Sequence, residues 1–327
     1  MDSLTQIAIG MATASFVADR ELKNKAILYG AIIGTLPDLD VLFGALFYDP
    51  ISALQLHRGF SHSLVFYILL APLLGWCIQQ LNPGKISLWT AIKMVFLTLL
   101  THTLIDMFTS WGTQIFWPLP ARVAIKSIFV IDVFYTLPWL FCLFKLYRSS
   151  GERRTYWLRT GFKITSCYLL VTLLVKLYIL QVVDAQLEKQ QVAVEEIMVK
   201  PTFSNVVLWN INVKTKNGYG IGAFSLLDTK PLKLQFYNQD QEVWNKYKGE
   251  AKIQQLMDLS EGWFLIEQNT AGTFFNDLRF GLLTDTQFAF SYIIKDTDTG
   301  VQILEAPKKP QDGKALLYKL MKRLIGN

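Results

Sequence analysis

The chain has 327 residues, 51% of them hydrophobic, and a positive mean hydropathy of +0.28, which excludes an ordinary soluble protein and leaves room for two domains. The net charge of +6 does not indicate nucleic-acid binding, because no basic stripe is interleaved with aromatic residues. Residues 1–184 carry 15 Lys/Arg against 10 Asp/Glu, whereas residues 185–327 carry 17 against 16, so the positive excess belongs to the apolar part of the chain.

The apolar segments predict membrane helices in the first 184 residues. Residues 4–18 are too short to span comfortably and predict a helix that lies in the interface or re-enters the membrane. Longer segments, each near the ~20 residues of a span, follow at 63–81, 88–109, 123–147 and 162–183. A further segment at 26–48 is interrupted by Pro37-Asp38-Leu39-Asp40, and a break at that depth indicates a polar pocket.

Basic residues predict the orientation of these segments. Segment 145–159 is rich in Lys and Arg and is expected on the cytoplasmic side. Alternation then places Arg20, Lys23, Lys25 and Lys85 inside, and the loops around 49–62 and 110–122 outside. His57 and His62 then lie in an outer loop, and His102 and Asp106 lie at the outer end of their helix, so these polar side chains gather toward the non-cytoplasmic face.

After Asp184 charges of both signs become common and no further span appears, so residues 185–327 predict a soluble α+β domain outside the cytoplasm. Segments 205–215, 219–227 and 287–295 alternate apolar and polar residues as strands do, with Asn217-Gly218 as a hairpin signal. Segments 240–258 and 312–325 are predicted helices, the latter amphipathic and basic. The expected fold is an α-helical multi-pass membrane domain (residues 1–184) of four to five spans plus the short first helix, followed by that domain.

All three histidines lie in the membrane part, where ionisable groups are costly and indicate function. His102 and Asp106 are four residues apart on a predicted helix, so both side chains lie on one face and can bind one ion. Alone, such a pair is more often a hydrogen-bonded helix contact. His57 and His62 flank a turn formed by Gly59 and Ser61, and both imidazoles can face one pocket.

Further charged residues suit the same pocket. Arg58, beside His57, has the geometry to bind an anionic phosphate group. Asp38 and Asp40 would repel each other in an apolar run unless cations or donors neutralise them, so either can be a ligand. Asp132 is expected to be a ligand or to orient a histidine. Three histidines with these carboxylates predict a metal site.

Several of these motifs together resemble the YdjM/YbcI family of bacterial inner-membrane metal-dependent hydrolases. The resemblance is carried by Asp2-Ser3-Leu4-Thr5, Gly34-Thr35-Leu36-Pro37-Asp38-Leu39-Asp40, His57-Arg58-Gly59-Phe60-Ser61-His62-Ser63, His102-x-x-x-Asp106, Trp111-Gly112-Thr113, Ile131-Asp132 and Asp277-Leu278-Arg279-Phe280-Gly281. It implies a multi-pass membrane protein with a hydrolase site distantly similar to that of zinc-dependent phospholipase C. Members of the family usually begin Asp-x-x-Thr-His, whereas this chain has Gln6 at the histidine position, and an amide oxygen is a poor substitute for imidazole on zinc.

The leading hypothesis is a metal-dependent hydrolase of the bacterial cytoplasmic (inner) membrane. Its expected metal ligands are Asp38, Asp40, His57, His62, His102 and Asp106, with zinc as the first choice of ion and manganese as the second. A metal-activated water would attack an ester, with Arg58, Asp40 and Asp132 as catalytic residues. The lipid bilayer is the expected partner, and a phospholipid or lipid-linked phosphoester the expected substrate class.

Two other functions remain open. The first is a non-catalytic membrane-anchored binding or scaffold protein in which the polar cluster only fixes helix packing, and Gln6 favours it. The second is a transporter with a proton relay, which the broken helix at Pro37 suits and the absence of a repeated half disfavours.

Overall fold

The computed structural model describes residues 1–284, 287–298, 300–307 and 313–327. They form two compact units, one of Met1–Leu174 with Phe203–Asn205 and the other of Val175–Thr202 with Val206–Asn327. The first unit is helical and the second contains two antiparallel sheets. A helical membrane domain followed by an α+β domain, as the sequence predicts, is therefore confirmed.

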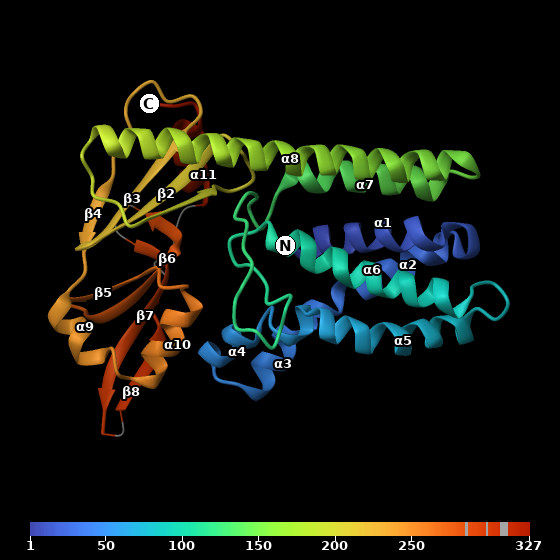
Figure 1. Ribbon diagram of the computed structural model, residues 1–327, viewed down its shortest axis with the longest axis horizontal. Helices are drawn as coiled ribbons and strands as arrows, with labels where there is room; N and C mark the ends of the chain where they lie inside the picture. The colour runs from blue at the N-terminus through green and yellow to red at the C-terminus, as the bar shows by residue number, and fades with distance from the viewer. Residues whose placement is uncertain (285–286, 299, 308–312) are drawn as a thin grey trace. The chain divides into compact units, whose positions relative to one another are not determined.

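The first unit is a bundle of helices joined by short turns (Figure 1). Its elements are α1 (Ser3–Leu22), α2 (Asn24–Thr35), a 3-10 turn η1 (Pro37–Leu39), α3 (Asp40–Phe47), α4 (Pro50–Leu56), a 3-10 turn η2 (Phe60–His62), α5 (Leu64–Leu81), α6 (Leu88–Met107), α7 (Val133–Arg148) and the first part of α8 (Glu152–Lys189). In the described part of the chain, four helical stretches are long and apolar enough to cross a membrane: Asn24–Phe47, Leu64–Leu81, Leu88–Met107 and Glu152–Lys189.

Helices α1 and α2 approach so closely that only glycine fits between them. A Cβ atom on Gly10 would collide with the backbone carbonyl of Gly30, and a Cβ on Gly34 would lie 2.9 Å from the carbonyl oxygen of Gln6. Small residues allow such contacts between membrane helices. The close packing brings Gln6 of α1 to the C-terminal end of α2, where η1 begins.

The span predicted over 123–147 is wrong in its bounds, and the helix found there, α7 with 16 residues, is not among the four stretches long and apolar enough to cross a membrane. Residues 108–132 are not helical, and α7 begins only at Val133, where the Asp132 side chain accepts hydrogen bonds from the amides of Phe134 and Tyr135. Residues 123–131 are apolar because they pack along the end of α6, where the Ile125 amide donates to the Met107 carbonyl at 2.6 Å. Hydropathy alone does not separate such a segment, packed against the protein, from a span.

Two further helices differ in length from the prediction. Helix α1 continues to Leu22, four residues beyond the predicted end, with non-helical backbone angles at Ala18. Helix α8 has 38 residues where 162–183 was expected, and at 1.5 Å per residue it is about 57 Å long. It is therefore longer than a bilayer is thick, and it runs from the first unit into the second.

The elements that carry the predicted site residues gather at one end of the bundle. The N-terminus, η1, η2 and the segment 108–132 lie there, and the turns that join α1 to α2, α5 to α6 and α7 to α8 lie at the other end (Figure 1). The second set of turns carries the basic residues that the sequence places in the cytoplasm.

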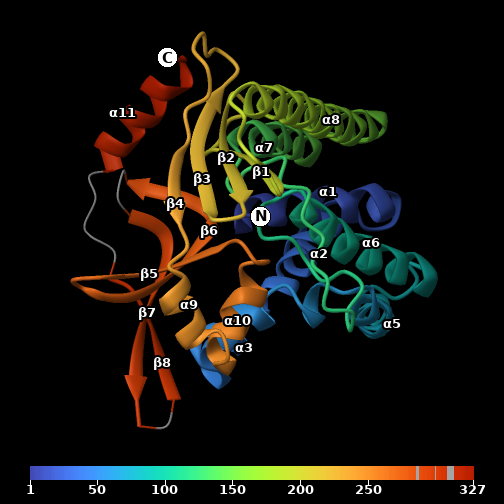
Figure 2. The same cartoon turned by 60° about the vertical axis from the view of Figure 1, so that its left-hand side comes forward.

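The second unit contains two four-stranded antiparallel sheets in the order β1-β2-β3-β4 and β5-β6-β7-β8 (Figure 2). The strands are β1 (Glu196–Pro201), β2 (Leu208–Thr215), β3 (Gly218–Ser225), β4 (Gln235–Asn238), β5 (Phe264–Asn269), β6 (Gly272–Thr284), β7 (Gln287–Thr297) and β8 (Gly300–Glu305). Ile179, Val183 and Leu187 of α8 share a core with Trp209 and Ile211 of the first sheet.

The predicted strands and helices of this unit are found with shifted bounds. Thr215 pairs with Gly218, so the hairpin turn is centred on Lys216 and Asn217 rather than on Asn217 and Gly218. The predicted helix 240–258 is two helices, α9 (Gln241–Tyr247) and α10 (Ala251–Leu259). Helix α11 is Gly313–Leu324, and residue 312 of the predicted 312–325 lies outside the described residues.

Candidate metal centre

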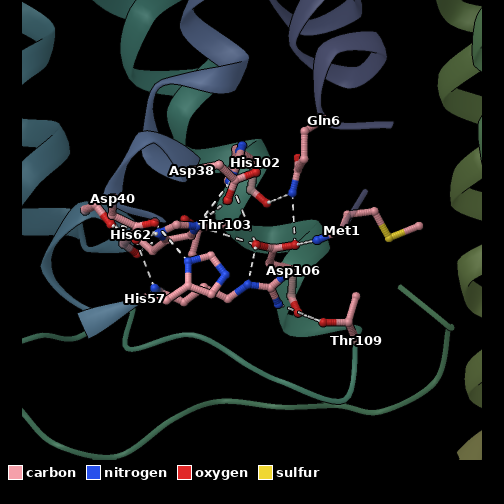
Figure 3. A network of polar contacts seen from close by, with 12 residues as sticks. Met1, Gln6, Asp38, Asp40, His57, His62, His102, Thr103, Asp106 and Thr109 are labelled. Atoms are coloured by element: carbon pink, nitrogen blue, oxygen red, sulfur yellow. Dashed lines mark hydrogen bonds and ion pairs between the residues drawn. The ribbon is translucent and has the colours of Figure 1, made fainter. Parts of the chain in front are cut away.

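Four side chains from three separate elements converge at the end of the bundle: Asp38 of η1, His62 of η2, and His102 and Asp106 of α6 (Figure 3). One ligand atom from each lies within 4.8 Å of the others. His62, His102 and Asp106 are fully buried, whereas the side chain of Asp38 is 24% exposed. Asp38 is therefore the most exposed of the four residues.

Local structure explains why these residues meet. His102 and Asp106 are one turn apart on α6 and point to the same side. Pro37 cannot continue α2 with a normal backbone hydrogen bond, and the chain turns into η1, which carries Asp38 under α6. Gly59 has no Cβ, and one placed there would lie 2.9 Å from the Leu56 carbonyl oxygen, so the turn before His62 requires glycine.

Both imidazoles of the cluster present Nε2 to its centre. His62 Nε2 lies 3.4 Å from Asp38 Oδ1 and 3.6 Å from Asp106 Oδ2. His102 Nε2 lies 3.5 Å from the same Asp38 oxygen and 3.8 Å from Asp106 Oδ2. The two Nε2 atoms are 3.2 Å apart. Two ring nitrogens facing each other and two carboxylate oxygens form a donor set of the kind that binds a divalent cation.

The other nitrogen of each ring is held by an acceptor or hydroxyl. His102 Nδ1 lies 2.7 Å from the carbonyl oxygen of Gly34, which can only accept, so Nδ1 carries a proton and Nε2 is the ring nitrogen that faces the cluster. His62 Nδ1 lies 3.0 Å from Ser61 Oγ and 3.5 Å from Asp40 Oδ2. Asp106 Oδ2 is buried and accepts no hydrogen bond in the described part of the chain. These features fit a cation between the four residues.

Asp40 and His57, which the sequence also predicts as metal ligands, lie beside His62 and outside the four-residue cluster, and their role as ligands stays a prediction. Asp40 Oδ1 lies 2.9 Å from His57 Nδ1, and its Oδ2 accepts hydrogen bonds from Ser61 Oγ at 2.5 Å and from the Arg58 amide at 3.0 Å. The reason is geometric: Asp40 is the first residue of α3, only two residues after Asp38, so its side chain points to a different side of the helix and contacts the loop before η2. It is placed to orient His62.

The remaining partners of Asp106 come from elements that the sequence did not connect to it. Arg58 Nε lies 3.3 Å from Asp106 Oδ2, and its Nη1 donates to Thr109 Oγ1. Gln6 Nε2 donates to Asp106 Oδ1 at 2.9 Å, and the Met1 amino group also contacts that oxygen. Figure 3 shows Gln6 and Met1 on one side of Asp106 and His62 on the other. In the sequence, only the motif Asp2-Ser3-Leu4-Thr5, which precedes Gln6, indicated that α1 belongs to the site.

Asp132, predicted as a ligand or catalytic residue, lies at the start of α7. Its Oδ1 caps that helix and its Oδ2 accepts a hydrogen bond from the Tyr168 hydroxyl at 2.8 Å. Among the described residues the structure gives it no hydrogen bond or ion pair with a histidine. Burial raises the pKa of Asp132 despite these hydrogen bonds. A catalytic role for Asp132 stays a prediction.

The two loop histidines differ in how well they tolerate a positive charge. Burial opposes the charged form of His62, but the nearby carboxylates of Asp106, Asp38 and Asp40 raise its pKa to about 9. Burial lowers the pKa of His57 in spite of its contact with Asp40. The environment of His62 is therefore strongly negative, as a cation site requires, and that of His57 is not.

Comparisons with known proteins agree with this picture of the membrane part. The inner membrane protein YbcI of Escherichia coli (strain K12) is 32% identical over 122 residues, which is 36% of this chain and 66% of that protein, just under two thirds of its length. No solved structure matches the chain. The model of the YdjM inner membrane protein family matches residues 1–181, more than half of the sequence. The chain therefore belongs to the YdjM inner membrane protein family.

Proposed function

We propose that this protein is a membrane-bound metal-dependent hydrolase that cleaves a phosphoester or a lipid-linked ester at the outer face of the cytoplasmic membrane. One observation carries the proposal: two imidazole Nε2 atoms and two carboxylate oxygens meet in a cluster whose members are buried except for the partly exposed Asp38. Buried charges of this kind are costly unless a counter-charge binds among them.

The metal ligands in this proposal are Asp38, His62, His102 and Asp106. Zinc suits a tetrahedral set of nitrogen and oxygen donors, and manganese is the second choice because half of the donors are carboxylates. A divalent cation in such a site supplies a Lewis acid and a water of lowered pKa, which together make ester hydrolysis possible at neutral pH.

The chain's own residues have supporting roles in this proposal. Asp40 orients His62 through Nδ1, and the Gly34 carbonyl orients His102 in the same way. Arg58 is 5% exposed and lies against Asp106, so its guanidinium brings positive charge to the edge of the cluster, where a phosphoryl oxygen would develop negative charge.

The proposed side of the membrane follows from charge. The cluster lies at the end of the bundle opposite the turns that carry Arg20, Lys85, Lys145 and Arg148, and basic loops favour the cytoplasm (Figure 1). An acyl-chain substrate reaches such a site from the surrounding lipid, which is why a phospholipid or a lipid-linked phosphoester is the proposed class.

Activity of purified full-length protein tests this function. With a chromogenic phosphodiester and with a fluorescent phospholipid, we expect metal-dependent turnover that a chelator removes and zinc or manganese restores. Asp106→Asn should lose at least about 100-fold, because ligand loss exceeds the effect of losing a supporting partner. Asp184→Asn, an equal change at an exposed carboxylate outside the site, should behave like the parent protein.

The second candidate function is a non-catalytic, metal-stabilised scaffold. The observation that favours it is Gln6, whose amide donates to Asp106 Oδ1 and occupies one side of the cluster. Stoichiometric metal without turnover on any ester substrate would favour the scaffold over the hydrolase. Turnover that persists unchanged in Asp106→Asn would contradict both.

A further inference from the structure

A second polar site lies at the opposite end of the bundle, at the turn between α7 and α8. It is a cavity of about 380 Å³ lined by six residues, which we call the basic cavity: Lys145, Arg148, Ser149, Arg153, Tyr156 and Trp157. Three of the six are cations and none is acidic. The two helices lie side by side in both views, so one face of each contributes to the cavity (Figures 1 and 2).

Aromatic rings rather than carboxylates hold these cations. The Lys145 ammonium lies 5.9 Å from the centre of the Trp157 ring and 5.6 Å from that of Phe141, and the Arg148 guanidinium lies 5.2 Å from that of Phe144. In the part of the chain that the structure describes, Lys145, Arg148 and Arg153 form no ion pair with an acidic side chain. Glu152 is the adjacent acid, and it does not line the cavity.

Arg154, at the same turn, differs from these three cations because a carboxylate neutralises its charge. Arg154 is buried, donates to both carboxylate oxygens of Asp19 at 2.6–3.0 Å, and also donates to Asn24 and to the Leu146 carbonyl. Among the described residues, the three cations of the basic cavity have no such partners. The cavity therefore favours an anion.

The surface around the cavity is apolar, and this favours an anion that also carries apolar groups. Phe141 and Phe144, which lie on α7 next to the cavity, are each 54% exposed. Tyr147 and Tyr156 are exposed as well. Aromatic residues collect at the headgroup level of a bilayer, and basic pockets between membrane helices on the cytoplasmic side bind anionic headgroups. A free phosphate would leave this apolar surface unused.

We propose that the basic cavity binds the phosphate headgroup of an anionic diacyl phospholipid, whose acyl chains lie along the exposed aromatic face of α7. The phosphate oxygens accept hydrogen bonds from Lys145, Arg148 and Arg153. This lipid site is independent of the metal centre and of the proposed hydrolase, and its occupant stabilises the α7–α8 hairpin.

Thermal unfolding of delipidated full-length protein in detergent tests the site. Titration with phosphatidylglycerol should raise the Tm in a saturable way, because a ligand that binds only the folded state stabilises it. Phosphatidylcholine, with the same chains and no net charge, should not raise it. Inorganic phosphate at matched concentration should also fail, because it cannot use the apolar face. An equal response to inorganic phosphate or to phosphatidylcholine would overturn the proposed occupant.

Charge-matched variants locate the site. The triple variant with Lys145→Gln, Arg148→Gln and Arg153→Gln should weaken the apparent affinity for phosphatidylglycerol at least about tenfold and lose retained lipid in native mass spectrometry. The control with Arg20→Gln, Lys85→Gln and Lys93→Gln removes three exposed cations at the same end of the bundle and should keep the response. Equal loss in both variants would overturn the proposal. If the triple variant fails to fold, Arg153→Gln alone should show a smaller loss, and an unchanged affinity there would contradict the site.

Discussion

The two histidines of the candidate metal centre are oriented by chemically different partners. His102 faces a backbone carbonyl, that of Gly34, which no side-chain substitution removes, whereas His62 faces the side chains of Ser61 and Asp40. The orientation of His62 can therefore be weakened by mutation without removing a ligand. Mutation of a residue that orients a metal ligand typically lowers the metal affinity about 10–100-fold.

Asp40→Asn tests whether Asp40 orients His62 or binds the ion directly. We expect the dissociation constant for zinc to rise about 10–100-fold while saturating zinc still loads the site, because the four inner residues remain. Competition with a chromogenic chelator measures this constant, and Asp184→Asn is the matched control. An unchanged constant would contradict the orienting role, and a site that no longer loads at any concentration would make Asp40 a ligand.

At the scale of elements, the metal centre depends on how closely α1 approaches α2. The glycine contacts between these helices position Gln6 beside Asp106 and hold the Gly34 carbonyl near His102. The backbone atoms that a new Cβ would meet cannot rotate away as a side chain can. Overpacking of this kind costs about 1–3 kcal/mol.

Gly30→Ala is therefore expected to lower the Tm of the detergent-solubilised protein and to reduce metal retention after dialysis. Differential scanning fluorimetry and elemental analysis measure the two effects. Gly249→Ala is the control, because a Cβ there meets no atom within 4 Å. A Gly30→Ala protein with unchanged Tm and full metal content would show that the close approach of α1 and α2 does not support the site.

Helix α11 is attached to the rest of its unit through a buried carboxylate. Asp228 accepts hydrogen bonds from both terminal nitrogens of Arg323, at 2.5 and 2.6 Å, and from the Ser225 amide at 2.9 Å. Burial opposes the charged form of Asp228, but these contacts hold its pKa below the usual value. A carboxylate with a depressed folded pKa stabilises the folded state above its unfolded pKa of about 3.9 and loses that contribution as the pH falls through the folded pKa.

Arg323→Met should accordingly lower the Tm at pH 7, and the difference from the parent protein should shrink as the pH falls below about 4. Intrinsic tryptophan fluorescence during heating measures both proteins at each pH. Lys322→Met, at an exposed neighbour on the same helix, serves for comparison. A Tm difference that stays constant from pH 7 to pH 3 would exclude the Asp228 contact as its source.

The sequence predicted this fold and site best where the signal is local. The spacing of His102 and Asp106 on one helix places both side chains together, and both lie in the cluster. Whether Asp40 or Asp38 faces that cluster depends on how η1 packs against α6, which no spacing encodes. The contacts of Gln6 and Asp132 could not be predicted either, because their partners Asp106 and Tyr168 are far away in the sequence. Residues 123–131 mimic a span because packing on α6 and burial in lipid demand the same apolar side chains.

At the scale of the whole molecule, one end of the bundle carries the polar cluster and the other carries the basic turns (Figure 1). If the basic turns face the cytoplasm, the metal centre and the basic cavity serve opposite leaflets. The proposed hydrolase then acts at the outer leaflet, and the proposed lipid anchors α7 and α8 in the inner one.

A reporter enzyme fused after Lys189, at the end of α8, tests this orientation in living bacteria. The orientation proposed here predicts that alkaline phosphatase, active only after export, is active in the fusion. The matching fusion after Leu81, at the end of α5, should be inactive, because that turn belongs to the basic end. The opposite pattern of activity would place the metal centre on the cytoplasmic side.

The most direct test of the central claim is elemental analysis of detergent-purified protein. Convergence of His62, His102, Asp38 and Asp106 on one cation predicts about one zinc or manganese ion per chain. His102→Ala and Asp106→Asn should each reduce this to background, whereas His57→Ala should retain it because His57 lies outside the cluster. A parent protein without stoichiometric metal after loading and dialysis, or variants with unchanged content, would contradict the claim.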